Sequence, residues 1–321
     1  MIFNENYFIW PKKNFFWRHL FKNPNIPTSK IENSLREIYK NQGYPILVSS
    51  GRVALSICID YLKFTKKNKI QLFPYASNCV RSAINKHTKY IIGNSEEHCD
   101  AKIIYHQLGY VQNFSKHKIT IEDGVDSFLT KGGKLFPLDG IFEIWSLRKI
   151  FGCIGGGIIW CKNPEIAKEI NSTIKSKKLL NNLVWILKIL SSYIQKLEIV
   201  TEKLELLCTR VPRWSNSQIM FYVKNIDHLE KQREQRLSMF EDVLPSWLKY
   251  NSKRLPCCVP LYVSEKKSKL LFKAGLISGY RHIEKFNINV ENSLEKIYPI
   301  PVHHQIPINF LEKIKDIIKN D

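Results

Sequence analysis

Short apolar runs alternate with helical patterns through the first half of the chain, and this alternation most constrains the fold. The runs KIQLFP (69–74), KITIEDG (118–124) and GGGIIW (155–160) are nearly continuous in apolar residues and are bounded by Gly, Asp or Pro. Such runs are typical of strands that are buried on both faces of a sheet. Helical patterns precede and separate them, as at 29–43 and 77–86. The sequence therefore predicts an α/β fold with a mainly parallel central sheet flanked by helices.

The character of the sequence changes after about residue 164, where a long helical stretch begins. The tail from about residue 250 mixes the strand-like run CCVPLYV with two further helical patterns. A chain of 321 residues is long for one compact core. We expect an N-terminal arm at 1–28, a large α/β domain at 29–205 and a smaller C-terminal α+β domain at 206–321.

The formal net charge of +20 would attract nucleic acid, anionic lipid or an anionic small molecule, but a composition rich in Lys, Asn and Ile throughout accounts for it equally well. The basic residues are scattered, without a basic stripe or a nucleic-acid-binding signature, so nucleic acid is the disfavoured partner. The eight cysteines show no C-x-x-C spacing and several lie in apolar runs, which indicates a reducing, cytoplasmic location. The nine histidines have no metal-ligand spacing, so no metal site is expected.

No transmembrane segment is expected either. The most apolar stretch, residues 179–200, is interrupted by Lys188 and Lys196 and is too polar for a confident span. An amphipathic helix packed internally or against a partner is the favoured interpretation, with contact to a membrane surface left open.

Three short segments place polar groups where predicted strands end. Residues 49–52 (SSGR) precede a helical pattern, and the start of a helix offers backbone N–H groups that hold a phosphate. Asp123 ends the run at 118–124, and Lys149 lies in an apolar stretch before a glycine-rich turn. Ligands of open α/β sheets bind beyond such strand ends. Alone, each segment has an ordinary alternative: a helix cap, a loop-capping carboxylate and a surface lysine.

Together the three segments contain the groups that a pyridoxal 5′-phosphate enzyme needs. That cofactor requires an anchored phosphate, a carboxylate for its ring nitrogen and a lysine that forms a Schiff base with its aldehyde. A lysine is rarely buried unless it is paired or chemically used. The position of Lys149 is therefore a candidate for the reactive amine.

The order and spacing of these segments resemble the DegT/StrS-type sugar aminotransferases, which depend on pyridoxal 5′-phosphate and have the aspartate aminotransferase fold (fold type I). The resemblance covers roughly residues 27–310 and depends on collinear order, since no single motif decides it. The segments that carry it are SSGRVALSICIDYL (49–62), FPYASNCVRSAI (73–84), AKIIYHQLG (101–109), ITIEDGVDSF (119–128), SLRKIFGCIGGGIIWCKN (146–163) and IPVHH (300–304).

The resemblance implies a role for each candidate residue. Lys149 would form the Schiff base and then move a proton, with its pKa lowered by burial and by the cationic cofactor. Asp123 would pair with the pyridine nitrogen. The other cofactor-binding positions would be Ser50, Gly51, Arg52 and Ser146 around the phosphate, Tyr75 near the ring, and Asp126 near the ring oxygen, where the family has Gln.

The implied reaction moves an amino group from an amino acid, glutamate, to a keto-sugar carried on a nucleotide diphosphate. A homodimer with shared active sites and, by analogy, a place in polysaccharide biosynthesis are also implied. Arg52 and Asp126 depart from the family pattern and keep open a catalytically altered or inactive relative that binds a sugar nucleotide or a partner protein. A sugar dehydratase is disfavoured because the lysine is present.

Further polar residues are weaker candidates, each with a solvated or core position as its alternative. We expect basic residues to bind the anionic carrier and one histidine to lie near the cofactor. Two more histidines are expected to line the mouth of the substrate site. These are Arg210, Arg213 and Arg281 for the carrier, His106 for the cofactor, and His303 and His304 for the mouth.

Overall fold

The computed structural model describes residues 6–13, 26–92, 98–112, 117–174, 178–191, 194, 196–245, 253–284 and 294–319. Most of the predicted arm at 1–28 therefore lies outside the described residues.

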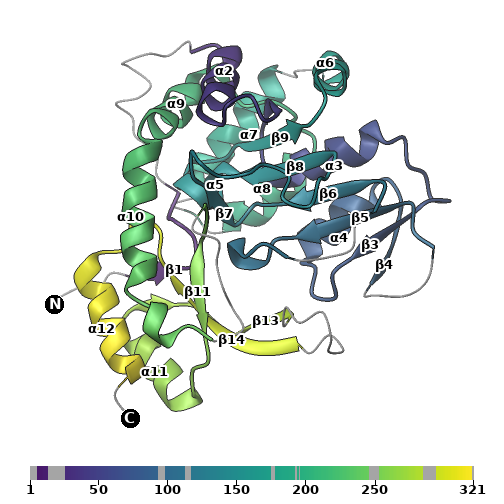
Figure 1. The fold of residues 1–321 in the computed structure, drawn as a ribbon. Coiled ribbons are helices and arrows are strands. Elements are labelled where there is room, and N and C mark those ends of the chain that lie inside the picture. Colours follow the sequence, from purple (N-terminus) through teal and green to yellow (C-terminus); the bar gives the residue numbers. More distant parts are fainter. Residues whose placement is uncertain are drawn as a thin grey trace.

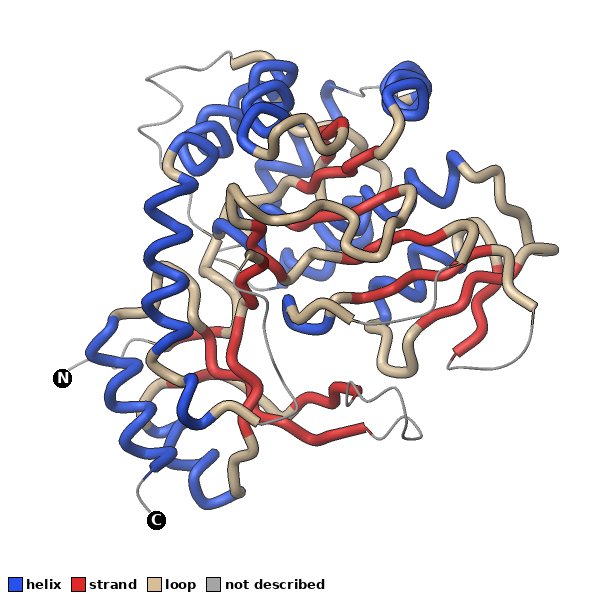
Figure 2. The backbone as a smooth tube through the Cα atoms, viewed as in Figure 1, coloured by secondary structure: helices blue, strands red, loops and turns tan. Residues whose placement is uncertain are grey.

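A seven-stranded sheet forms the centre of the molecule (Figures 1 and 2). The strands from β8 to β4 pair in parallel, and β9 is antiparallel to both of its neighbours. This confirms the predicted α/β fold with a mainly parallel sheet. In spatial order the strands are β2 (Tyr44–Val48), β9 (Gly157–Cys161), β8 (Phe142–Ser146), β6 (Thr120–Asp123), β5 (Ala101–Tyr105), β3 (Lys69–Leu72) and β4 (Lys89–Ile92).

Helices cover both faces of this sheet, and the alternation of side chains along the strands explains how. Leu47 of β2 and Trp145 of β8 face one core, while Ile46 and Ile144 beside them face another. The first core also contains residues of α2 (Thr28–Ile38), α7 (Lys178–Leu190), α9 (Asn216–Lys224) and α10 (Ile226–Ser238). The second contains residues of α3 (Gly51–Tyr61), α4 (Asn78–Asn85) and α6 (Pro164–Thr173).

A smaller α+β part lies beside the large sheet, and α10 runs along the side of the molecule between the two (Figure 1). Its sheet has the antiparallel order β11 (Cys258–Leu261), β14 (Leu294–Pro301), β13 (Arg281–Glu284). The helices α11 (Glu265–Lys273) and α12 (Ile308–Lys319) pack against each other, and residues of both share the first core with residues of this sheet. The division at residues 205 and 206 stays a prediction, because the first core contains residues from both sides of it.

Short elements connect these parts. β1 (Tyr7–Phe8) pairs in parallel with β12 (Leu276–Ile277), and β7 (Ser127–Leu129) pairs antiparallel with β10 (Arg254–Pro256). The remaining elements are α5 (Leu147–Phe151), α8 (Lys196–Glu205) and the 3-10 turns η1 (Gln107–Gly109), η2 (Arg213–Ser215) and η3 (Glu241–Val243).

The strand β8, which leads directly to Lys149, is missing from the runs that the sequence predicts. Its segment FEIWS carries a charged residue, although all of its residues are buried. Glu143 is fully buried and its carboxylate lies 2.9 Å from Nη1 of Arg254. It also accepts hydrogen bonds from the Trp145 indole and from the backbone N–H of Phe136. The guanidinium of Arg254, about 110 residues later in the chain, thus stabilises the Glu143 carboxylate inside the sheet.

Among the described residues, no helix combines the length and apolar character needed to cross a membrane. All eight cysteines are free thiols, and all except Cys79 are buried.

Candidate active site

A cavity of about 540 Å³ lies beyond the carboxyl ends of β6 and β8, and all the candidate residues of the cofactor site line it. Parallel strands end at the same edge of a sheet, which is why residues so far apart in sequence meet there. The residues brought together are Ser50, Gly51, Arg52, Tyr75, Asp123, Asp126, Ser146 and Lys149.

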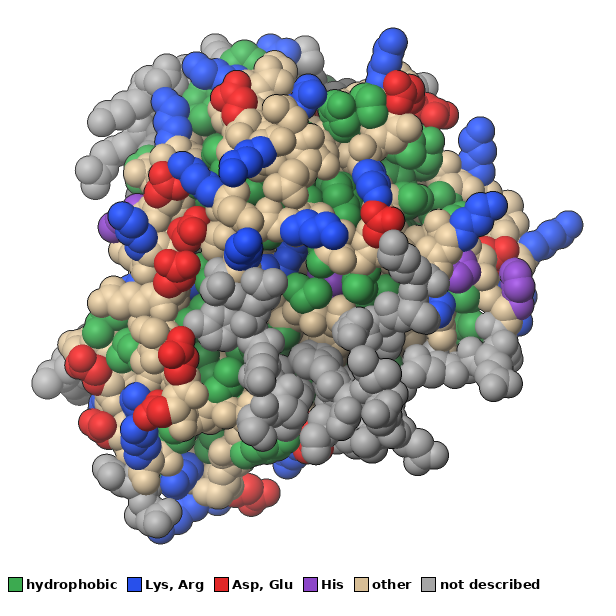
Figure 3. Space-filling model, in the orientation of Figure 1, with side chains coloured by type: hydrophobic (Ala, Val, Ile, Leu, Met, Phe, Trp, Pro, Cys, Tyr) green, Lys and Arg blue, Asp and Glu red, His purple; other side chains and the backbone are tan. Residues whose placement is uncertain are grey.

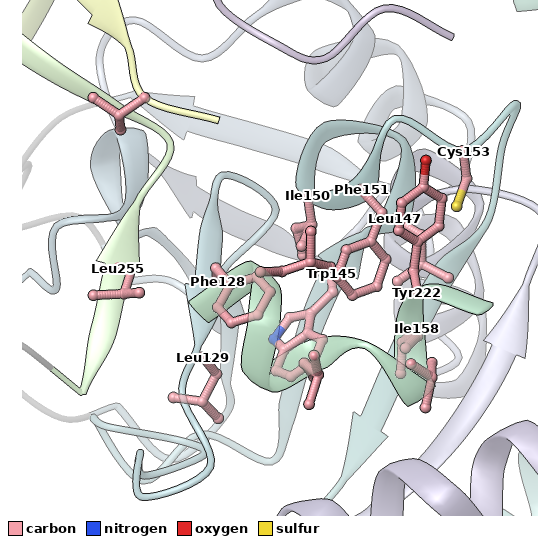
Figure 4. Close-up of a cluster of buried hydrophobic side chains, with 14 of the residues drawn as sticks. Phe128, Leu129, Trp145, Leu147, Ile150, Phe151, Cys153, Ile158, Tyr222 and Leu255 are labelled. Atoms are coloured by element: carbon pink, nitrogen blue, oxygen red, sulfur yellow. The ribbon is translucent and has the colours of Figure 1, made fainter. Parts of the chain in front are cut away.

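Lys149 lies on the short helix α5, which begins immediately after β8. Three other side chains of α5, those of Leu147, Ile150 and Phe151, are buried in the first core. Figure 4 shows Phe151 in this cluster, where its ring stacks on Tyr222 at 5.4 Å. Because its neighbours anchor the helix on one side, Lys149 lines the cavity on the other. It is a helical residue fixed by packing, so the alternative of a surface-loop lysine is wrong.

Asp126 is the closest acidic partner of Lys149, with Oδ1 3.0 Å from Nζ. The carboxylate is almost fully buried. It also accepts a hydrogen bond of 2.9 Å from Nε1 of Trp10 and one from the Tyr105 hydroxyl. The Lys149 ammonium lies 4.8 Å from the centre of the Trp10 ring. Asp126 therefore links β5, α5 and the segment around Trp10.

The electrostatics of Lys149 differ from the sequence expectation. Burial favours the neutral amine, but the charges of Asp126 and Asp123 outweigh it and raise the pKa of Lys149. The expectation counted burial and a cationic cofactor and left out Asp126 as a counter-charge. In this structure Lys149 is held as an ammonium by the two carboxylates.

Asp123, the last residue of β6, is the second buried carboxyl of the cavity. Burial raises the pKa of Asp123 to about 7. The charge of Lys149 and the hydrogen bond from Val125 lower this pKa, and the charge of Asp126 raises it further. Within the described part of the chain, its hydrogen-bond donor is the backbone N–H of Val125 at 3.2 Å. A cationic N–H donor in the cavity would stabilise the ionised form of this carboxyl.

The start of α3 also lines the cavity. Ser50 caps the helix, with Oγ accepting a hydrogen bond from the Val53 backbone N–H. A Cβ on Gly51 would lie 3.1 Å from Val125 and 3.3 Å from the Cβ of Ser146. Glycine therefore permits a close approach here, and the first turn of α3 leaves backbone N–H groups for an anion.

An aromatic wall completes the cavity. Phe73 packs against Tyr75 at 5.3 Å and against Tyr105 at 5.0 Å between ring centres. All three rings line the cavity. A flat ligand beside Asp123 would therefore meet aromatic side chains as well as Val125.

Of the three arginines proposed for the anionic carrier, one lines the cavity. Arg281 on β13 lines the cavity, and its guanidinium lies 5.4 Å from the centre of the Trp10 ring. Arg210 instead binds Asn171, and Arg213 begins η2; neither belongs to the described lining.

The three histidines also lie outside the described lining of the cavity. His106 is fully buried with Nε2 2.9 Å from Glu122, so it is a core histidine with a partner. Burial lowers the pKa of both His303 and His304 to about 3. His303 binds the backbone carbonyl of Phe8, and the His304 ring lies 5.8 Å from Tyr222.

Sequence reasoning missed several residues of the cavity. Trp10 and Tyr105 carried no chemical signal. Lys188 carried such a signal, because it is a lone lysine in the apolar run LVWILKIL, as Lys149 is in its own segment. In the sequence analysis it served only as an argument against a membrane span. It lines the cavity together with Glu205 of α8.

Comparisons with known proteins agree with this geometry. Residues 31–321 match the protein family described as "Putative PLP-dependent aminotransferase". The chain belongs to this family. Dependence on pyridoxal 5′-phosphate (PLP) and aminotransferase activity, both predicted from the sequence, follow from the membership. No curated protein sequence matches the chain significantly.

Solved structures confirm the predicted resemblance in fold. "Putative PLP-dependent aminotransferase from Bacillus cereus" is 14% identical with a TM-score of 0.66, and the match covers 98% of this chain and 100% of that one. "Putative sugar aminotransferase Spr1654 from Streptococcus pneumoniae, PLP-form" is 12% identical with a TM-score of 0.63, covering 96% and 97%. A "DegT DnrJ EryC1 StrS aminotransferase from Brucella abortus" is 9% identical with a TM-score of 0.61, covering 94% of each chain.

The residues of this aminotransferase fit its cofactor. The buried Asp123 has room for a cationic ring nitrogen as a partner, and the glycine at the start of α3 leaves an anion-binding cradle. Lys149 supplies an amine in the same cavity. The donor set thus matches the three parts of the cofactor.

Proposed function

We propose that this aminotransferase moves an amino group from an amino acid, glutamate, to a keto-sugar carried on a nucleotide diphosphate. The observation that carries the proposal is the meeting of Lys149, Asp123 and the start of α3 in one cavity. A volume of about 540 Å³ lies in the range of small-molecule sites. The sugar acceptor is supported by the fold that this chain shares with the "putative sugar aminotransferase Spr1654 from Streptococcus pneumoniae".

The proposed roles of the residues follow from their positions. Bound PLP supplies an aldehyde that takes up the amino group and a pyridinium ring that accepts electrons. Lys149 Nζ removes the proton from the α-carbon of the amino acid and returns a proton later, so it must be a neutral amine at that moment. Asp123 holds the proton on the ring nitrogen, because its buried carboxylate is stabilised by a neighbouring cation.

Ser50, Gly51 and Ser146 hold the phosphate in this proposal. Gly51 brings the backbone close to Ser146, so the N–H groups of α3 and the serine hydroxyl converge. Tyr75 lines the ring side of the cavity, next to Phe73. Asp126 lies at Lys149 and orients its amine before the cofactor is attached.

Arg281 is the proposed contact for an anionic substrate group. It lies on β13, at the part of the cavity formed by the smaller α+β part, and its side chain is exposed. Figure 3 shows that other Lys and Arg side chains on the face in view are dispersed among acidic ones. By analogy with sugar aminotransferases we place the reaction in the cytoplasm and in polysaccharide biosynthesis.

The proposed homodimer with shared active sites is supported by an exposed apolar stripe on α7. The stripe follows one helical face, and the hairpin of α7 and α8 also lines the cavity through Lys188 and Glu205. A second copy of the chain that covers the stripe would therefore lie beside the active site. The stripe consists of Leu179, Leu183, Ile186 and Leu190.

Light scattering of Leu183→Glu tests the dimer. We expect the wild type to have twice the mass of the chain and Leu183→Glu to have the monomer mass, while Leu270→Glu on α11, also an exposed leucine, stays dimeric. A monomeric wild type that binds anionic vesicles through Leu183 would instead identify a membrane surface as the occupant.

Spectroscopy and turnover test the reaction. The purified protein should show a visible PLP absorbance band that borohydride removes, with the cofactor then fixed to Lys149 in a peptide mass map. Lys149→Ala should lack the fixed cofactor and lose about 10²–10⁴-fold in proton transfer. Glutamate should then convert the cofactor to its amine form, and keto-sugar nucleotides should return it to the aldehyde form.

If the protein binds PLP but exchanges no amino group with any amino acid, the proposed aminotransferase reaction is refuted. That result would favour the alternative of a catalytically altered relative. If the protein exchanges an amino group with glutamate but with no keto-sugar, only the proposed keto-sugar acceptor is refuted.

A further inference from the structure

Lys188 is a buried cation that the proposed reaction does not use. It lies on α7, and its side chain is 7% exposed. Its Nζ lies 2.5 Å from Oε1 of Glu205 on α8 and 5.3 Å from the centre of the Trp185 ring. A lysine is rarely buried to this extent without a specific partner.

Glu205 is shared between two cations. Its Oε2 lies 3.8 Å from Nε of Arg52, the residue that follows Gly51 at the start of α3. Burial opposes ionisation of Glu205, but Lys188 outweighs it, with Arg52 and Arg148 adding to the effect, and the pKa of Glu205 is lowered. The cluster of Lys188, Arg52 and Glu205 therefore carries two positive charges and one negative charge.

This cluster lies beside the backbone that begins α3. A Cβ placed on Gly155 would lie 3.0 Å from Nζ of Lys188 and 3.2 Å from the backbone carbonyl of Ser49. All three members of the cluster line the active-site cavity. Lys188 and Arg52 therefore place two cationic side chains where α3 presents its N-terminal backbone N–H groups.

We propose that Lys188 binds the phosphate of the cofactor, with Arg52 as the second cation and Glu205 as the carboxylate that positions both. The proposal rests on the proposed function for the presence of PLP in this cavity. A lysine ammonium has three N–H donors, so Lys188 keeps its bond to Glu205 while it donates to a phosphate oxygen. A phosphate would form charge-assisted hydrogen bonds with this ammonium. The helical hairpin of α7 and α8 thus takes part in cofactor binding from within the same chain.

The test compares PLP with pyridoxal, which has the same ring and aldehyde but no phosphate. Cofactor-depleted wild type and Lys188→Met are titrated with each compound, and binding is followed by the visible absorbance. Lys203→Met, an exposed lysine on α8, is the matched control. We expect Lys188→Met to weaken PLP by about 10- to 100-fold, as for loss of a hydrogen bond to a charged group, with pyridoxal and the control changed less than about twofold.

Inorganic phosphate gives a second measurement that needs no aldehyde. It should compete with PLP for the wild type and compete at least tenfold more weakly for Lys188→Met. Because Lys188→Met leaves the carboxylate of Glu205 buried, the double variant Lys188→Met/Glu205→Gln is measured as well. The same selective loss of PLP over pyridoxal is expected there.

Equal loss of PLP and pyridoxal in the variants would overturn the proposal, since it would assign Lys188 a structural role. Unchanged PLP affinity would overturn it as well. In both cases the wild type still binds PLP and the proposed function stands, whereas a wild type that binds neither compound overturns both.

Discussion

The substitution Asp123→Asn should change how the stability of the cofactor-free protein depends on pH. Burial raises the pKa of Asp123 from its ordinary value of 3.8 to about 7. The carboxyl therefore binds its proton more tightly in the folded chain than in the unfolded chain. Asparagine has nearly the same shape and does not titrate, so it removes this difference.

The sign and the magnitude follow from linkage. Between the two pKa values the folded chain retains a proton that the unfolded chain has lost, so the stability falls as the pH rises. The contribution of Asp123 is fully present below pH 3.8 and is lost as the pH rises through about 7. With about 1.4 kcal/mol for each pKa unit, this contribution is about 4 kcal/mol.

Urea denaturation of the cofactor-free proteins measures the effect. From about pH 5 to about pH 8, the free energy of unfolding of the wild type should fall by about 3 kcal/mol relative to Asp123→Asn. Asp316→Asn, an exposed carboxyl on α12, should follow the wild type. Parallel pH curves for wild type and Asp123→Asn would refute the reasoning, because they would mean that burial does not hold a proton on Asp123.

Three further substitutions test other parts of the structure. Asp126→Asn removes one of the charges that raise the pKa of Lys149, so attachment of PLP to the depleted protein should reach its half-maximal rate about 1 to 2 pH units lower; an unchanged pH profile would contradict this. Glu143→Gln leaves Arg254 buried without its carboxylate partner and should cost about 3–5 kcal/mol in urea denaturation, while a cost below about 1 kcal/mol would mean that the pair is not desolvated. Gly157→Ala places a Cβ 2.3 Å from the backbone carbon that precedes α3, so PLP affinity should fall while the far-UV circular dichroism stays; unchanged affinity would show that the start of α3 can shift without loss.

The sequence predicts the residues at strand ends well, because each carries a local signal. Ser50 and Gly51 open a helix, Asp123 closes an apolar run, and Lys149 interrupts one. The parallel arrangement of the strands then brings these ends to one edge without further information. The cavity that holds all of them is the consequence of that arrangement.

Residues that depend on long-range partners could not be predicted in the same way. The strand β8 was missed because Glu143 reads as a surface charge until Arg254, from another part of the chain, is placed beside it. Trp10 contributes through a hydrogen bond to Asp126 and through its ring beside Lys149 and Arg281, and the residues next to it in the sequence indicate none of these contacts. Lys188 stands out in its apolar run, but the sequence does not show that Glu205 is its partner. Glu205 lies on the next helix, and the contact depends on how α7 and α8 pack together.

The charges around the cavity form two poles, and this division argues for a ligand with opposite charges at its two ends. At one pole the carboxylate of Asp126 faces Lys149, and Asp123 becomes a second carboxylate when a cation lies beside it. At the other, the cationic side chains of Lys188 and Arg52 meet Glu205 at the start of α3. PLP has a basic ring nitrogen and an anionic phosphate, so one molecule in one orientation neutralises both poles. Substitutions at the two poles should therefore separate: Asp126→Asn should affect PLP and pyridoxal alike, and Lys188→Met only PLP.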